Sequence, residues 1–319
     1  MDEFTLIEKY FKILTYNNPA ALDLNDDVFF DKKCNVVVSM DTYVEGVHFL
    51  NFRKPDLVIK KIVRSSISDL YCKGVKPKFI FIGASGNNNS FSKKNLNIIS
   101  KSLKEEQKKY GIKLSGGDTT KSNKIIFTIM SMGYSKKIVQ RNKCKNGDDI
   151  YVTGNMGDSY LGLQILKRKV LLNKKEHNYF INKYYLPDLP IEISSNLLKF
   201  ANSSIDISDG LFGDLSKLIN KSELFYKVDL NKVPISINLR NYLTKCQKKK
   251  INFISKGDDY QIIFTSPKSK RNYIQKFFKK MNQKVTLIGN LTKHAKNNVI
   301  IEGNNRLKHK YNEAYSHNF

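Results

Sequence analysis

Cysteine is scarce in this sequence, and no stretch of it is apolar over the length of a membrane span. The four cysteines, at positions 34, 72, 144 and 246, are far apart, and no two form a Cys-x-x-Cys pair. This spacing argues against a zinc site and against a disulfide framework. No stretch approaches the roughly 20 apolar residues that cross a bilayer. The segment 1–11 lacks the basic region and apolar core of a signal peptide. We therefore expect a cytoplasmic protein with no membrane partner.

The familiar phosphate-binding motifs are also absent. The chain has no G-x-x-x-x-G-K-[ST] loop, no G-x-G-x-x-G turn and no kinase-type catalytic loop. Its five histidines are dispersed, with His48 isolated from the others. Any nucleotide must therefore be held by another arrangement of residues.

Acidic residues are the minority charge. There are 29 Asp plus Glu against 55 Lys plus Arg, which gives a formal net charge of +26. Such a charge would attract nucleic acid or other anions. Basic runs such as Lys248-Lys249-Lys250 are, however, typical of an exposed surface, and aromatic residues do not interleave with them as they would in a base-stacking surface. We expect no nucleic-acid partner, although a basic nucleic-acid-binding protein stays open as an alternative.

The length of 319 residues predicts two domains, because single hydrophobic cores usually stop growing below this size. Apolar runs suited to strands alternate with helical patterns in both halves. The predicted fold class is therefore α+β or α/β, with a mixed sheet packed with helices in each domain. A polar segment, 136–149, separates the two blocks, and we place the boundary at residue 137, with domains 1–137 and 138–319.

Local signals place several elements. Pro55 opens a long helical pattern, which Gly74 ends. Residues 92–110 also have the apolar spacing of a helix. Residues 79–82 predict a short strand, closed by a turn over 83–89.

Clusters of acidic residues lie mostly beside apolar runs, where strands should end or helices begin. Magnesium takes oxygen ligands and prefers a few carboxylates together with substrate phosphates, so these positions are candidates for hard-cation sites. Taken singly, each cluster has a plainer interpretation. Asn25-Asp26-Asp27 is more often a turn, and Ser68-Asp69 lies within a predicted helix, where Asp most often projects from the polar face. The cluster at 206–210 could equally be a helix cap, and the paired glycines could form either a glycine turn with a helix cap or a close backbone approach to a ligand. The clusters are Asn25-Asp26-Asp27, Ser39-Met40-Asp41, Ser68-Asp69, Gly116-Gly117-Asp118-Thr119-Thr120 and Asp206-Ile207-Ser208-Asp209-Gly210.

The order and spacing of these motifs resemble the thiamine-monophosphate kinase family, within the superfamily typified by aminoimidazole ribonucleotide synthetase. The resemblance runs from the first helix to the last residues, and its most specific part is Val44-Glu45-Gly46-Val47-His48-Phe49. The other matching segments are Val152-Thr153-Gly154, Gly157-Asp158-Ser159, Gly257-Asp258-Asp259-Tyr260, and Tyr315-Ser316-His317 with Phe319.

The resemblance implies ATP-dependent phosphorylation of thiamine monophosphate to thiamine diphosphate, with several Mg²⁺ ions and with ATP as co-substrate. It implies a two-domain aminoimidazole ribonucleotide synthetase-like fold and a homodimer whose amino-terminal domains pair through their sheets. The first domain would bind ATP and magnesium and dimerise, and the second would complete the nucleotide and substrate site.

The resemblance also implies site residues by motif match. The metal ligands, or their immediate support, would be Asp27, Ser39, Asp41, Asp69, Asp118, Asp206 and Asp209. The contacts to ATP would be Gly117, Asp118, Arg141 and Ser208, and those to thiamine monophosphate His48, Asp258 and Tyr315.

Elementary electrostatics supports this interpretation. If several carboxylates converge on a site for two phosphorylated substrates, repulsion between like charges forbids binding unless divalent cations intervene. The acceptor is a phosphate monoester with a second pKa of about 6, so it is mostly dianionic at neutral pH and needs no general base. We therefore expect no catalytic acid or base, and expect direct in-line transfer that depends on alignment and charge neutralisation.

Three positions depart from the family pattern. Asn25 stands where the family has Gly, which is tolerable because Asn also visits left-handed backbone conformations. Met40 replaces a Thr; a thioether is a poor magnesium ligand, so either the backbone carbonyl serves there or one metal site is weakened. Asp258 replaces a Glu and could reach the substrate through water. Another ATP-using enzyme of the same superfamily remains an alternative.

Overall fold

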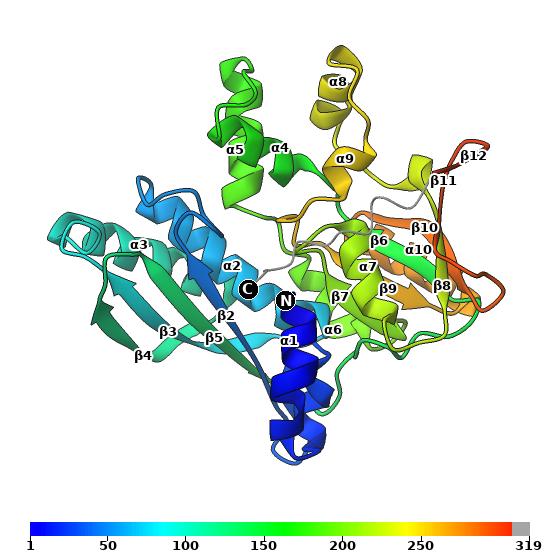
Figure 1. Ribbon diagram of the computed structural model, residues 1–319, viewed down its shortest axis with the longest axis horizontal. Coiled ribbons are helices and arrows are strands. Elements are labelled where there is room, and N and C mark those ends of the chain that lie inside the picture. Colours follow the sequence, from blue (N-terminus) through cyan, green and yellow to red (C-terminus); the bar gives the residue numbers. More distant parts are fainter. Residues whose placement is uncertain (308–319) are drawn as a thin grey trace.

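Two mixed sheets organise the chain, whose computed structural model describes residues 1–307 (Figure 1). The amino-terminal sheet has five strands in the order β1-β2-β5-β3-β4, with β3 and β4 parallel and the other pairs antiparallel. Its strands are β1 Phe29–Asp31, β2 Val36–Val44, β3 Pro77–Gly86, β4 Lys113–Lys121 and β5 Ile126–Tyr134.

One face of this sheet is covered by the helices α2, Pro55–Cys72, and α3, Lys93–Tyr110 (Figure 1). The helix α2 begins with proline at its first turn, where the missing N–H has no helical partner to lose, and Gly74 follows it with φ +80°. Almost every side chain of α2 is buried, because the helix also packs against β7, α5 and α6 of the second half. It is therefore the element that joins the two halves of the molecule.

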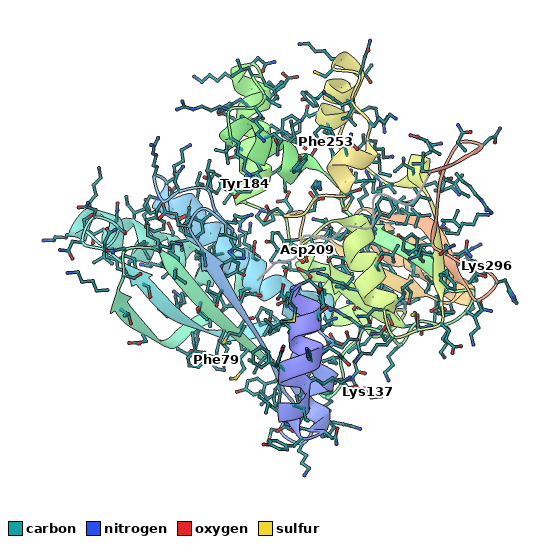
Figure 2. All side chains as sticks on the ribbon, viewed as in Figure 1. Phe79, Lys137, Tyr184, Asp209, Phe253 and Lys296 are labelled. Carbon is teal, nitrogen blue, oxygen red and sulfur yellow. The ribbon has the colours of Figure 1, made fainter. Side chains whose placement is uncertain are left out.

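Within residues 1–307, no helix covers the opposite face of the amino-terminal sheet, which is called the open face below. Strand alternation puts Phe127, Ile129 and Tyr43 under the helices and sends their neighbours to the open face. Figure 2 labels Phe79 on this side. The apolar residues of the open face are half-buried or exposed and comprise Val38, Met40, Phe79, Phe81, Met130, Met132 and Tyr134.

The carboxyl-terminal sheet has seven strands in the order β12-β11-β8-β10-β6-β9-β7, in which only β11 and β8 are parallel. Helix α7 covers one face, while α6 and α10 cover the other. The strands are β6 Asp149–Thr153, β7 Ser203–Asp206, β8 Phe225–Asp229, β9 Ile262–Ser266, β10 Val285–Thr292, β11 Val299–Glu302 and β12 Asn305–Leu307. The helices are α4 Asp158–Leu166, α5 Lys174–Tyr185, α6 Ile191–Leu197, α7 Leu211–Ile219, α8 Ile237–Lys245, α9 Ile251–Ile254 and α10 Arg271–Lys280.

The expected mixed sheets with packed helices are confirmed, as are the helices beginning near residues 55 and 92. Two local expectations are wrong. Strand β3 continues to Gly86 rather than turning after Ile82, and residues 116–120 are neither turn nor cap but part of β4. The reason is pairing, because β3 and β4 hydrogen-bond in parallel over this stretch and tertiary contact overrides the turn preference of glycine.

The amino terminus is helical but irregular. Helix α1 covers only Glu3–Leu6 and continues as a π-helical turn, Ile7–Phe11, and a 3-10 turn, Lys12–Thr15. The two sheets lie on either side of residue 137 in the sequence, and the domain boundary there stays a prediction. Across residues 1–307, none of the helices combines the length and apolarity needed to cross a membrane.

A buried ion pair links α2 to α3. The guanidinium of Arg64 donates two hydrogen bonds to Glu106, at 2.8 and 2.9 Å, and both side chains are nearly inaccessible. The adjacent Glu105 instead pairs with Lys60 at 2.6 Å, and its side chain is half exposed. Neighbouring residues of one helix therefore make the same kind of pair in two different environments.

We predict that Glu106→Ala lowers the free energy of unfolding by about 3 kcal/mol, because it leaves the Arg64 charge buried without a partner. Glu105→Ala is the matched control and should lower it by less than about 1 kcal/mol, since an exposed pair is screened by water. Urea denaturation followed by circular dichroism measures both. Equal losses in the two variants would contradict the assigned role of burial.

Candidate active site

A group of carboxylates lies where α2, β2 and the β7–α7 turn meet. Ser39 and Asp41 project from the face of β2 that lies towards α2, and the hydroxyl of Ser39 donates a hydrogen bond to Asp69 on α2. The hydroxyl of Ser68 donates to Asp206 at the end of β7, at 2.6 Å. Two adjacent helical residues thus connect the amino-terminal sheet with the carboxyl-terminal one.

These carboxylates repel one another. Burial raises the pKa of Asp69 well above its usual range, and the neighbouring Asp41 and Asp206 raise it further. Burial likewise raises the pKa values of Asp41 and Asp206 to about 6. Within residues 1–307 no ion pair joins any of these three side chains to a basic residue. Burial and mutual repulsion therefore disfavour the ionised form of these carboxyl groups. A hard divalent cation takes oxygen ligands and would restore the charged form.

A second acidic pair, Asp26 and Asp27, is already matched by cations. Lys73 lies 2.7 Å from Asp26 and 2.5 Å from Asp27, and Arg141 pairs with Asp27 through its guanidinium. The backbone N–H of Arg141 also donates to Asp26 at 2.9 Å. One possible ligand atom from each of Asp27, Cys72 and Asp206 lies within 4.8 Å of the other two. This pair therefore borders the carboxylate group on one side and basic residues on the other.

The β7–α7 turn carries Ser208 and Asp209 at the entrance of α7, and Figure 2 shows Asp209 in the region between the two sheets. Lys217 of α7 forms ion pairs with Asp209 and, at 3.3 Å, with Asp214. The backbone of Ser208 is held by Asp258, whose N–H donates to the Ser208 carbonyl at 2.9 Å. The two turns therefore lie side by side, although 50 positions separate Ser208 from Asp258 in the sequence.

An aromatic cluster with one ion pair adjoins this turn. Lys61 of α2 is buried, pairs with Asp258 and lies 4.0 Å from the centre of the Tyr184 ring. The hydroxyl of Tyr184 donates to the carbonyl of His48 at 3.3 Å, and that of Tyr260 donates to Asp258 at 3.2 Å. His48 and Asp258, predicted from separate motifs, are thereby brought to one cluster.

Tyr43 connects this cluster to the carboxylates. Its ring makes an edge contact with His48 at 5.9 Å between centroids, and its hydroxyl donates to Asp41 at 3.1 Å. Burial raises the pKa of Tyr43 well above its usual range, and the nearby Asp41 adds to the rise, so this hydroxyl stays protonated and acts as a donor. The carboxylate group and the aromatic cluster are thus in continuous contact.

Some predicted residues do not join this site within one chain. Gly117 and Asp118 lie on β4, an exposed edge strand that β5 and β3 separate from β2, so Asp118 is about 14 Å from the line of Asp41 by strand spacing alone. The side chain of Met40 is 68% exposed on the open face, away from Ser39 and Asp41. Tyr315 lies outside the described residues.

Comparison with known proteins agrees with this geometry. Residues 17–135 match the family described as AIR synthase related protein, N-terminal domain. The chain is 32% identical to thiamine-monophosphate kinase of Haemophilus influenzae, covering 91% of this chain and 89% of the relative. It is 34% identical to that of Buchnera aphidicola subsp. Acyrthosiphon pisum, with 91% of each chain covered. The chain belongs to the thiamine-monophosphate kinase family.

A solved structure supports the same membership. AaThiL complexed with AMPPCP and TMP resembles this chain with a TM-score of 0.84 and 26% identity, over 99% of this chain and 97% of the other. The expected aminoimidazole ribonucleotide synthetase-like fold is therefore confirmed.

Sequence reasoning found Arg141 but missed the lysines of the site. Lys61 and Lys73 are both buried and both pair with aspartates that the motifs had singled out. A signal was present, because Lys61, Asp69 and Lys73 are spaced at multiples of four and so lie along one side of the helix. Lys217 stands eight residues after Asp209 and gives a similar signal.

We predict that Asp209→Ala reduces turnover by at least about a hundredfold, the usual effect of removing a group that stabilises transition-state charge. The fold should survive, because Lys217 keeps Asp214 as a partner. The measurement is kcat together with the melting temperature. Asp188→Ala, which removes an exposed carboxylate paired with Lys183, is the control and should leave both values unchanged. Full activity of Asp209→Ala would reject a role in metal binding.

Proposed function

We propose that this chain transfers the γ-phosphoryl group of ATP directly to the phosphate of thiamine monophosphate, forming thiamine diphosphate. The observation that carries the proposal is the junction of two unlike groups of residues, in which the Asp41–Asp69–Asp206 group adjoins the aromatic cluster of His48, Tyr184 and Asp258. The first suits phosphates bound through cations, and the second, rich in aromatic rings, suits an organic ring compound. The likeness to a structure holding AMPPCP and TMP supports the same pair of substrates.

The residues that would hold Mg²⁺ are Asp41, Asp69 and Asp206, with Ser39 as support and with Asp27 and Asp209 at the margins. When bound, magnesium would neutralise the phosphate oxygens and the charge that develops on the transferred group. Asp41, Asp69 and Asp206 have no role as bases here, because the acceptor phosphate is already dianionic. Their task is to fix positions, which the hydrogen bonds from Ser39 and Ser68 secure.

Arg141 would exchange partners when ATP binds. In the chain alone its guanidinium pairs with Asp27. Arginine presents a planar set of donors that fits phosphate as well as carboxylate. A nucleotide phosphate could therefore take Arg141 and free an oxygen of Asp27 for a cation. Ser208, which is partly accessible at the β7–α7 turn, would contact the same nucleotide.

At the acceptor end, His48 and Asp258 would contact thiamine monophosphate, as the family resemblance implies. Asp258 is held by Lys61 and by the Tyr260 hydroxyl, so its carboxylate has a defined position. Asp258 sits at φ +71°, a conformation that non-glycine residues adopt rarely and that suits a functional turn.

The homodimer is likewise a proposal, supported by the open face and by the place of Asp118. Apolar side chains such as Met130 and Phe81 remain partly exposed on a wide sheet surface, which is typical of an interface. Asp118 is in register with Gly83, and Gly83 with Thr128, on this same face. Pairing of two open faces would let β4 of one copy approach β2 of the other, so that Asp118 and Gly117 complete the partner's site.

We also retain the cytoplasm as the proposed compartment. All four cysteines are free thiols, which fits a reducing environment.

The direct test is to incubate the purified protein with ATP, Mg²⁺ and either thiamine monophosphate or thiamine, and to separate the products by chromatography. We expect thiamine diphosphate from the monophosphate, and none when Mg²⁺ is removed with a chelator. If ATP is not turned over with either acceptor, the proposed reaction is rejected.

We predict that Met132→Lys converts a dimer into a monomer, because it places a charge in the centre of the apolar open face. Light scattering after gel filtration measures the mass, and turnover should fall with it if Asp118 acts across the interface. Ser100→Lys, on the exposed side of α3, is the matched control and should change neither. A fully active monomeric wild type would contradict the dimer.

A further inference from the structure

Lys73 is a buried cation that the proposed reaction does not use. It follows the last residue of α2 and has no accessible surface. Its ammonium group contacts Asp26 at 2.7 Å, Asp27 at 2.5 Å and the carbonyl oxygen of Ser204 at 2.8 Å. An ammonium has three N–H donors, so these three oxygens satisfy it completely.

The atoms around this ammonium group resemble those around a bound metal ion. Asp26, Asp27 and a backbone carbonyl are all oxygen donors of the kind that hard cations take. Asp27 also belongs to a second group of donors, because possible ligand atoms of Asp27, Cys72 and Asp206 lie within 4.8 Å of one another. An ion held by those atoms would lie beside the lysine and be repelled by it.

The two halves of the acidic site therefore differ in how their charge is balanced. Asp26 and Asp27 are neutralised by Lys73 and Arg141, which belong to the chain itself. For Asp41, Asp69 and Asp206 the described residues supply no ion-pair partner. Charge balance thus directs divalent ions towards the second group.

We propose that the ammonium group of Lys73 stands in for one divalent cation and thereby sets how many metal ions the site binds. This inference rests on the proposed magnesium-dependent function. Lys73 acts through Asp26 and Asp27 and is a positioning residue. It keeps that acidic pair compensated whether or not metal is bound, and it leaves the Asp41–Asp69–Asp206 group as the part that needs metal.

A purely structural role would predict something different. Lys73 also joins the end of α2 to β7 through the Ser204 carbonyl, so its loss must weaken the contact between the two halves. Weaker packing alone adds no metal ion. The number of bound ions therefore separates the two roles, and stability does not.

The experiment counts Mn²⁺ bound per chain from the electron paramagnetic resonance signal of the free ion, without nucleotide or acceptor. We expect Lys73→Met to bind one more Mn²⁺ than the wild type, at the Asp27–Cys72–Asp206 position, and Lys73→Arg to bind the wild-type number. Arg64→Met is the matched control, because it removes a buried cation from the same helix but pairs with Glu106 outside the acidic site; its count should not change. An unchanged count in Lys73→Met would overturn the inference and leave the proposed reaction standing, whereas a wild type that binds no Mn²⁺ would overturn both.

A second variant tests the idea if Lys73→Met does not fold. Asp26 accepts from Lys73 and from the backbone of Arg141 and Asp27, so it should hold no divalent ion in the wild-type background. Asp26→Asn is therefore expected to keep the wild-type number of Mn²⁺ ions. Loss of an ion in this variant would overturn the inference.

Discussion

The burial of α2 between the two sheets is the constraint on which the site depends. Apolar residues such as Ile62 and Val63 pack into a cluster shared with α5 and β5, while Cys72 packs against residues of the carboxyl-terminal sheet. A helix enclosed in this way cannot send most of its polar side chains to water. Buried polar groups without partners are costly, and the buried cations of α2, Lys61 and Arg64, find partners inside the protein.

The partners come from distant parts of the chain, and together they build the site. Lys61 meets Asp258, Ser68 meets Asp206, and Lys73 meets Asp26. Because buried polar groups of this helix need hydrogen-bond or ion-pair partners, the acidic motifs gather around it. The apolar packing of α2 thus positions charged and polar side chains from both halves of the chain.

Charge is distributed unevenly along this helix. Lysines compensate the aspartates near both ends of the site, and the carboxylates between them stay uncompensated, with their pKa values raised by burial. Such a site repels phosphates until cations enter. Strand geometry also separates the predicted residues into two groups. Alternation of side chains sends Met40 and Asp118 to the open face and leaves Ser39 and Asp41 on the face that lies towards α2.

The sequence by itself determined the fold class, the long helix from Pro55 and the family, because these depend on local pattern and on motif order. For the same reason it singled out most of the aspartates that the structure brings together around α2. It did not determine that residues 116–120 form an edge strand, since that depends on pairing with β3. Nor did it reveal Lys61, Lys73 and Tyr184 as parts of the site, because a lysine or tyrosine carries no local sign of the partner it will meet. Only the tertiary structure decided which aspartates are matched by lysines, because pairing between charges depends on distance in space and on the exclusion of water.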